Sequence, residues 1–399
     1  FNMNKTLITK LSGRIANSEL LRLGEIRITI DKEISPSSKS RSLDITVNKD
    51  TAIEIVGEGY FTDERLSANK GKSIVLSQGN NTVYVSNDNV ILAVLNKYNI
   101  TKLYFEHIDN ISMSSDAKHK HFDLSSFKYC NLLTDLVLPN TSTTGDVSEI
   151  SNLTNLTYLY LSKTLITGDL SSLKNLSSLS NITIESVAIT GDLSSLSGLT
   201  SLTTINLTKT AITGDLSSLS GLTSLDSLLA EHTQITGNLS SLSGLTKLTR
   251  LYLRETKTNG DTSVLRCYNL KTLHVTDATF NVNSMKAFNK LTSIILYNSS
   301  ISGDIATLSD TLNLLLVDTA SVKSCTWSSR KSSAKIISMP YYLITDNIDK
   351  MLQDQAQCQA DVTSSYKTIV AKGTRTSASD AAIQTLQTKG YTVTILPTD

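Results

Sequence analysis

The chain has 399 residues and a formal net charge of +1 at pH 7. This near balance excludes a global electrostatic field that would recruit nucleic acid or an acidic membrane surface. No apolar run is long enough to cross a bilayer, which excludes a transmembrane segment. The four scattered cysteines form no CxxC pair, which argues against a disulfide framework.

The chain begins with residues 1–24, where charged residues interrupt every apolar run, so the apolar core of a signal peptide is missing. Period-two patterns then recur from RITI at 27–30 to VILAVL at 90–95, separated by clusters of turn-forming residues. These patterns predict an N-terminal β-rich domain over residues 1–98. We expect it to lead directly into the next segment and to cover its open end.

The stretch from Gly145 to Gly260 repeats one pattern every 23 residues. Residues 191–213 read GDLSSLSGLTSLTTINLTKTAIT, and residues 214–236 read GDLSSLSGLTSLDSLLAEHTQIT. A fixed period of this size predicts a solenoid of stacked units. The copy that starts at Leu202 follows L-x-x-L-x-L-x-x-T-x-I, which resembles a leucine-rich repeat with Thr where Asn or Cys is usual. The sequence therefore predicts an α/β leucine-rich-repeat solenoid over 99–345, with a parallel sheet on its concave face.

The fourth position of this pattern is expected to be buried at the centre of a short strand. Its members are Leu103, Leu136, Leu159, Ile182, Ile205, Leu228, Leu251, Leu273, Ile294, Leu315 and, as a weak copy, Ile337. The other half of each copy, GDLSSLSGLTS, predicts a 3₁₀ or loose helical turn, because its leucines recur every third residue.

After residue 345 the composition changes, and an α-β-α-β cap is expected over 346–399. Asp346 is predicted to cap the first helix, and Ser377 with Asp380 has the spacing of a capping box at the second. Gly390 is placed to end that second helix, and YTVTIL at 391–396 to form a closing strand.

The segment KTIVAKGTRTSASDAAIQTLQTKGYTVTI, together with the I-T-G-D-L-S-S-L repeats, resembles leucine-rich-repeat proteins of Bacteroides-type gut bacteria. The resemblance covers nearly the whole chain. It implies a non-enzymatic surface or recognition protein, sometimes in a prophage setting, and it supplies no binding residues.

A column of acidic residues follows the repeated glycines, with Asn238 in place of one of them. Two interpretations are open: a bound Ca²⁺ that relieves repulsion between the carboxylates, or caps that accept backbone N–H bonds at each turn. Capping is favoured because Asn238 can make the same bond. The column consists of Asp146, Asp169, Asp192, Asp215, Asp261 and Asp304.

The positions beside the buried leucines point to the concave face and vary from copy to copy, although the frame does not. Tyr and Arg among them are residue types enriched in binding hot spots. The predicted ligand-binding residues are Tyr104, Tyr158, Tyr160, Glu231, Arg250, Tyr252, Arg254 and His274. An idle sheet surface is the alternative, because sheets favour Tyr for packing alone.

No nucleophile with a base, phosphate loop or cofactor motif is present, and Glu231, His232 and Glu255 are interpreted as a solvated charge pair. His119 and His121 lack a third ligand, so no metal site is expected. The sequence predicts a non-catalytic adhesion protein outside the cell or on its surface that binds a protein or glycan. The alternative is a receptor-binding or structural component of a phage tail, located in the virion.

Overall fold

The computed structural model describes residues 123–128, 130–318, 325–344, 347–360 and 367–397, and before them Gln78 and the strands given below. Residues 1–24 and His119 lie outside the described part. The chain divides into two compact units, residues 1–202 and 203–399. Within the described residues, no helix combines the length and apolar character needed to span a bilayer.

The first unit opens with antiparallel strands, as the period-two patterns predict. Strand β2 pairs with β6 and β8, and a second sheet has the order β5-β3-β7-β1-β9. Because β8 also pairs in parallel with the first repeat strand, the sheet of this region continues into the repeats. The strands are β1 (Arg27–Ile30), β2 (Ser42–Val47), β3 (Thr51–Ile55), β4 (Phe61–Thr62), β5 (Ser73–Leu76), β6 (Gly79–Val85), β7 (Val90–Val94), β8 (Ile100–Tyr104) and β9 (Lys120–His121).

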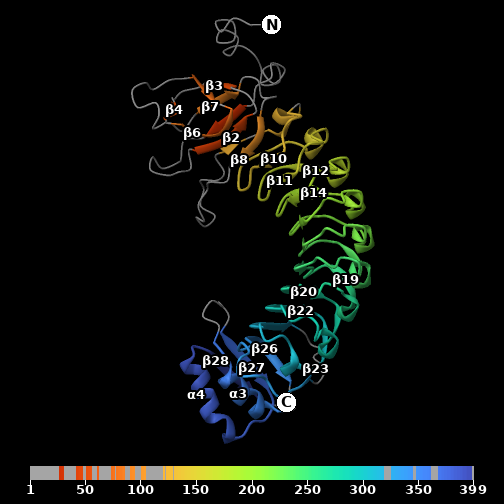
Figure 1. Cartoon of the computed structure of the whole chain (residues 1–399), viewed down its shortest axis with the longest axis vertical. Coiled ribbons are helices and arrows are strands. Elements are labelled where there is room, and N and C mark those ends of the chain that lie inside the picture. Colours follow the sequence, from red (N-terminus) through yellow and green to blue (C-terminus); the bar gives the residue numbers. More distant parts are fainter. Residues whose placement is uncertain are drawn as a thin grey trace, which may run out of the picture. The chain divides into compact units, whose positions relative to one another are not determined.

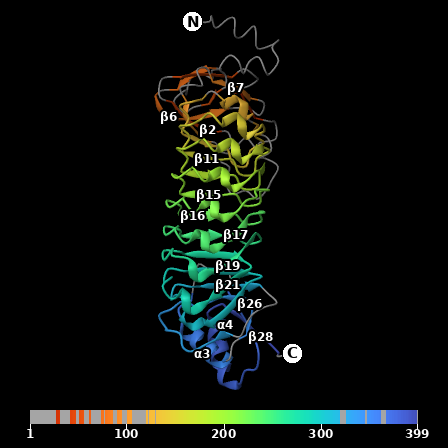
Figure 2. The ribbon, with the colours of Figure 1, turned by 90° about the vertical axis from the view of Figure 1, so that its right-hand side faces the viewer.

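Each repeat contributes one strand to a parallel sheet, and this confirms the predicted leucine-rich-repeat solenoid (Figures 1 and 2). The first unit contains β10 (Asp135–Val137), β11 (Tyr158–Tyr160) and β13 (Asn181–Thr183). The second contains β15 (Thr204–Asn206), β16 (Ser227–Leu229), β18 (Arg250–Tyr252), β20 (Thr272–Thr276), β22 (Ser293–Tyr297) and β24 (Leu314–Asp318).

The predicted column of apolar residues is in register from strand to strand within each unit. Leu136 lies opposite Leu103 and Leu159, and Leu228 lies opposite Ile205 and Leu251. The column is buried from Leu136 to Leu315. The assignment of Ile337 as the last member of the column is wrong.

Ile337 does not occupy the frame position that follows Leu315. A parallel bridge joins Leu314 to Ser338, which places Met339 rather than Ile337 level with Leu315. Ile337 is nevertheless buried, and its backbone is bound by Gln355: the Ile337 N–H donates to Oε1 at 3.0 Å.

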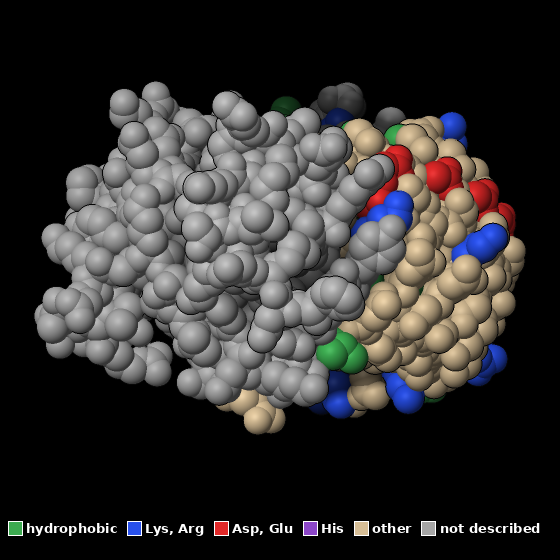
Figure 3. Space-filling view, turned by 90° about the horizontal axis from the view of Figure 1, so that it is seen from above, with side chains coloured by type: hydrophobic (Ala, Val, Ile, Leu, Met, Phe, Trp, Pro, Cys, Tyr) green, Lys and Arg blue, Asp and Glu red, His purple; other side chains and the backbone are tan. Residues whose placement is uncertain are grey.

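The opposite side of each repeat is a 3₁₀ turn, and the acidic column caps these turns. In every case Oδ1 of the capping residue accepts the N–H two positions later, so the capping interpretation is confirmed; Asn238 bonds Ser240 in the same way at 2.9 Å. Acidic side chains recur in a row on the surface (Figure 3). The turns are η6 (Leu124–Phe127), η7 (Val147–Ile150), η8 (Leu170–Leu173), η9 (Leu193–Leu196), η10 (Leu216–Leu219), η11 (Leu239–Leu242), η12 (Thr262–Val264), η13 (Val282–Met285) and η14 (Ile305–Thr307).

Glycine precedes the capping residue because the preceding repeat leaves no room for a side chain. A Cβ on Gly237, which has φ +109°, would lie 2.8 Å from Oδ2 of Asp215. Gly168 meets Asp146 in the same way at 2.7 Å. The recurrent Gly-Asp pair is therefore a contact between neighbouring repeats as well as a local turn.

A second row of short parallel strands runs between the main sheet and the 3₁₀ turns, where the sequence predicted only turns. In the first unit it consists of β12 (Thr167–Asp169) and β14 (Ala188–Thr190). In the second it consists of β17 (Thr236–Asn238), β19 (Lys257–Asp261), β21 (Ala278–Asn281), β23 (Ser300–Asp304) and β25 (Cys325–Thr326).

A left-handed residue joins the main strand to this second row in each repeat. Its N–H donates to a carbonyl of the following repeat, as from His232 to Arg254 at 3.0 Å. In most repeats a Thr comes next and donates its hydroxyl to the carbonyl three positions earlier, as Thr233 does to Ala230 at 2.7 Å; in the others this position holds Val187, Ala278 or Ser299. The left-handed residues are Asn140, Lys163, Ser186, Lys209, His232, Glu255, Asp277 and Asn298.

The C-terminal region has the predicted α-β-α-β order, with one further strand in front. The parallel strands β26 (Met339–Ile344), β27 (Thr368–Lys372) and β28 (Thr392–Leu396) form one sheet, with helices α3 (Ile348–Gln357) and α4 (Asp380–Thr388). Gly390, at φ +85°, follows the end of α4 as predicted.

Two predicted helix starts in this region are wrong. Asn347 rather than Asp346 caps α3, because its side chain accepts the Lys350 N–H at 2.9 Å. No capping box forms at α4. Instead, Thr376 caps the short 3₁₀ helix η15 (Ser377–Ser379), and Asp380 pairs with Arg375.

The last repeat is closed by Arg330 and Asp354, both about 5% exposed. The guanidinium of Arg330 donates to the carbonyls of Leu308 and Ser309, each at 3.1 Å. Asp354 accepts the indole N–H of Trp327 at 3.0 Å and the backbone N–H of Arg330 at 3.1 Å. These bonds satisfy polar groups that the end of the repeat would otherwise leave buried and unpaired.

Candidate functional site

The predicted ligand-binding residues occupy the open face of the parallel sheet in both units. In the first unit, the backbone register places Val137 between Tyr104 and Tyr160, so these two tyrosines are two strands apart. Tyr158 and Tyr160 are half-buried on β11. The side chain of Tyr104 lies outside the described residues.

In the second unit the predicted residues form one connected cluster, which we call the Tyr252 cluster: Glu231, Arg250, Tyr252, Arg254 and His274. Tyr252 and His274 occupy the same register position on β18 and β20. Their rings stack with centroids 4.0 Å apart and an interplanar angle of 13°. The separation follows from the spacing of neighbouring strands, which is about 4.8 Å.

The charged members of the Tyr252 cluster are already engaged. Nδ1 of His274 lies 3.2 Å from Oε1 of Glu231, and their side chains are only 13% and 21% exposed. Nη2 of Arg254 lies 2.8 Å from Oε1 of Glu255. Arg250 is the exposed member of the cluster. The face is thus a preorganised aromatic and charged surface, in which stacking and pairing hold the side chains in place.

Glu255 joins this cluster to the turns beside it. Its second oxygen, Oε2, lies 2.8 Å from Nδ1 of His232, which confirms the predicted charge pair. Glu255 thus bridges Arg254 and His232, and the side chain of each of these three residues is about one third exposed. A pair with this exposure contributes at most about 1 kcal/mol to stability, so its importance lies in orientation.

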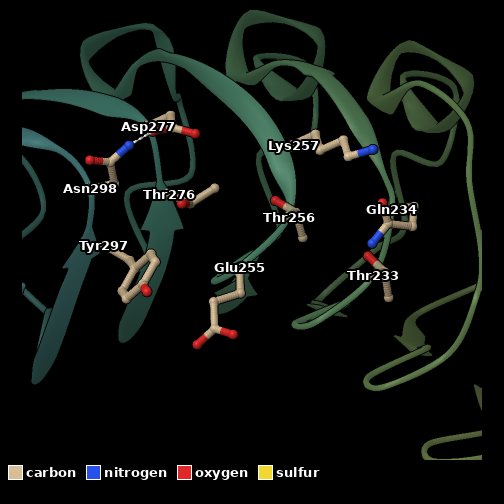
Figure 4. Close-up of a pocket in the computed structure, with 9 residues that line it drawn as sticks. All are labelled: Thr233, Gln234, Glu255, Thr256, Lys257, Thr276, Asp277, Tyr297 and Asn298. Carbon is tan, nitrogen blue, oxygen red and sulfur yellow. Dashed lines mark hydrogen bonds between the residues drawn. The ribbon is translucent and has the colours of Figure 1, made fainter.

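A polar groove adjoins the Tyr252 cluster at the left-handed turns. It encloses a volume of about 500 Å³. Figure 4 shows Asp277 and Asn298 on one side, Lys257 and Gln234 on the other, and threonines between them. Its lining comprises Thr233, Gln234, Glu255, Thr256, Lys257, Thr276, Asp277, Tyr297 and Asn298.

Tyr297 links the groove to the sheet face. It ends β22, and Cζ of Arg254 lies 6.0 Å from the centroid of its ring. On one side of the groove, the Asn298 amide donates to Asp277. Of the groove residues, the sequence pointed only to Glu255, as part of a charge pair, because only strand positions were considered for ligand binding. The left-handed residue comes four positions after each frame Leu or Ile, and this spacing could have pointed to the groove.

The described residues contain no cluster of three or more His, Cys, Asp or Glu side chains placed to hold a metal ion. The four cysteines are buried and unpaired with one another. Burial raises the pKa of Cys267 to about 11 and that of Cys325 to about 12, so neither thiol is activated as a nucleophile.

No family model and no curated protein matches the chain. Solved structures do. A TDR receptor has TM-score 0.53 and 18% identity over 68% of this chain and 48% of its own. The plant peptide hormone receptor RGFR1 in complex with RGF2 has TM-score 0.50 and 21% identity, covering 66% and 44%.

A third similar structure is the leucine-rich-repeat ectodomain of the membrane receptor kinase GASSHO1/SCHENGEN3 from Arabidopsis thaliana, in complex with CASPARIAN STRIP INTEGRITY FACTOR 2. It has TM-score 0.50 and 20% identity, covering 69% of this chain and 36% of that one. The chain spans less than half the length of these three structures. At these identities the likeness shows the leucine-rich-repeat fold alone.

Proposed function

We propose that the chain is a non-catalytic binding protein that holds a protein or glycan ligand against the open face of its parallel sheet, at the Tyr252 cluster. The observation that carries this proposal is the contrast between a repeated frame and a varied face. From β15 to β22 the frame position holds only Ile or Leu, whereas the neighbouring outward position holds Asn206, Leu229, Tyr252, His274 and Ile295.

The chemistry of the cluster supports recognition rather than packing. Tyr and Arg dominate the energetic centres of interfaces, and stacked or paired side chains lose little entropy when a ligand binds. The receptors with a similar fold include two solved with a bound partner, which is compatible with binding by this fold. We place the protein outside the cell or on its surface, as the resemblance to surface proteins of gut bacteria implies.

The test starts from arrays of glycans and of extracellular proteins probed with the labelled full chain. For the strongest binder, we expect Tyr252→Ala and Arg254→Ala each to weaken binding at least tenfold, which corresponds to about 1.4 kcal/mol. Tyr268→Ala is the matched control, because Tyr268 is 46% exposed and contacts Phe288 rather than the cluster. Unchanged affinity in a triple variant that also carries Tyr160→Ala would remove the sheet face as the site.

A further inference from the structure

The groove beside the Tyr252 cluster contains polar groups that the protein itself leaves unused. Among the described residues, the Gln234 amide, the Lys257 ammonium and the Tyr297 hydroxyl have no hydrogen-bond or ion-pair partner. All three line the same cavity. Gln234 and Lys257 are exposed, so these groups are hydrated in the free protein and are available to a ligand that lies across the three repeats.

We propose that this groove binds a neutral sugar unit, such as one end of an oligosaccharide. Sugar hydroxyls both donate and accept, and neighbouring hydroxyls can be held by one planar amide or carboxylate. Gln234, Asn298 and Asp277 supply such planar groups on both sides of the groove (Figure 4). The ring of Tyr297 offers a flat surface for the C–H face of a sugar.

The charge of the groove favours a neutral ligand over an ionic one. Its two carboxylates are Glu255 and Asp277. Glu255 pairs with Arg254 at 2.8 Å, Asp277 accepts from the Asn298 amide, and Lys257 brings one positive charge to the lining. A polyanion or a basic peptide would therefore meet no net opposite charge here.

The lining also argues against a peptide side chain as the occupant. Apart from Tyr297, every lining residue is polar, and none is aliphatic. An apolar anchor residue, which dominates most protein contacts, would gain little by entering. The volume of about 500 Å³ lies within the usual range of small-molecule sites.

The groove coincides with a break in the repeat. Asp277 lies four positions before its capping residue, Asn281, whereas Asn298 lies six positions before Asp304. The repeat that carries Asp277 thus lacks two residues, including the recurrent glycine. This shortened turn lies in the middle of the groove, between the turns of Glu255 and Asn298, in each of which six positions separate the left-handed residue from its cap.

The proposal concerns a different surface from the sheet face, so the two can be tested separately. The probes are neutral disaccharides: lactose, maltose, cellobiose and N,N′-diacetylchitobiose. Each is titrated into the full chain and followed by saturation-transfer NMR and calorimetry. We expect at least one to bind with a dissociation constant of about 0.1–10 mM, the weak range of a small polar ligand.

The groove variants are Asn298→Gly, Tyr297→Ala and Gln234→Ala. Glycine is chosen at residue 298 because it keeps the left-handed backbone, at φ 46°, while removing the amide. Each variant should weaken the sugar at least tenfold. The matched controls, Lys209→Gly at the same turn position outside the groove and Tyr268→Ala, should leave its affinity unchanged.

Three results would overturn the proposal. They are the absence of binding by any of the four sugars, sugar binding that survives all three groove variants, and a charged peptide that binds through Lys257 where the sugars do not. Tyr252→Ala distinguishes failure of the sugar site from failure of the proposed function of the sheet face. It should weaken the ligand found on the arrays while leaving the disaccharide titration unchanged.

Discussion

The two long sides of the repeats in the second unit differ in how their polar groups are used. On the side of the 3₁₀ turns, an Asp or Asn caps every turn and its oxygen accepts the N–H two positions later, although the turn itself changes from LSSL to TSV, VNSM and IAT. On the side of the strands and left-handed turns, the residues vary, and Gln234, Lys257 and the Tyr297 hydroxyl have no partner among the described residues. The difference teaches that uniform polar residues here hold the fold, while the varied ones are available to a ligand.

The largest expected effect comes from comparing substitutions at two adjacent residues, one in the buried frame and one on the open face of the sheet. Ile205 is fully buried, so Ile205→Asp places an unpaired carboxylate in the core and should cost several kcal/mol, roughly 3 or more, in the free energy of unfolding. Asn206→Asp is the matched control, because residue 206 is half-buried on the open face. Denaturant unfolding followed by circular dichroism measures both, and equal midpoints would refute the register.

A smaller effect is expected from the glycines of the uniform side. Gly237→Ala forces a side chain into φ +109° and against Asp215, and should destabilise the protein by about 1–3 kcal/mol. A Cβ on Gly221 would meet nothing within 4 Å, so Gly221→Ala should be neutral or slightly stabilising. Thermal melts of the two variants compare them directly, and a harmless Gly237→Ala would show that the inter-repeat contact is unimportant.

The smallest effect concerns the capping carboxylates. The hydroxyl and N–H of Ser171 lower the pKa of Asp169, and Ser194 does the same for Asp192. Because the folded pKa is below the unfolded one, this stabilisation is complete above the unfolded value, near pH 4, and is lost as pH falls through the folded pKa. Melting temperatures should therefore be unaffected by these caps from pH 5 to 8 and should decline below about pH 4.

The same caps predict the response to metal removal. Since each carboxylate is satisfied by its own turn, EDTA at pH 7 should leave the melting temperature unchanged. If EDTA lowered the melting temperature by several degrees and Ca²⁺ reversed this change, the acidic column would be a cation site rather than a set of caps.

The repeat could be predicted from the sequence because each buried position recurs in many copies. A period of 23 residues indicated the strands from Leu136 to Leu251, the same pattern at steps of 22 and 21 residues extended them to Leu315, and Asn238 favoured capping over cation binding. Prediction failed where a feature occurs once. Ile337 was assigned by counting residues, but the irregular chain before it shifts the register by two positions.

The candidate site was predictable only in part. Alternation within strands identified Tyr252 and His274 as neighbours, and spacing across the sheet explains their stacking. The groove depends on left-handed backbone at Glu255, Asp277 and Asn298. Asp and Asn are enriched in this conformation but Glu is not, so residue type alone marks only two of the three positions. It also depends on a two-residue deletion, whose effect on the neighbouring repeats no local pattern shows.

The left-handed turns have a consequence for how such a chain can change its length. The bond that each turn makes to the next repeat involves backbone atoms only, from Lys209 to Glu231 at 2.9 Å and from His232 to Arg254 at 3.0 Å. A duplicated 23-residue segment that keeps the buried frame residues therefore inserts with these backbone partners supplied. Each duplication would lengthen the sheet by about 4.8 Å and add a fresh set of outward positions on which selection can act.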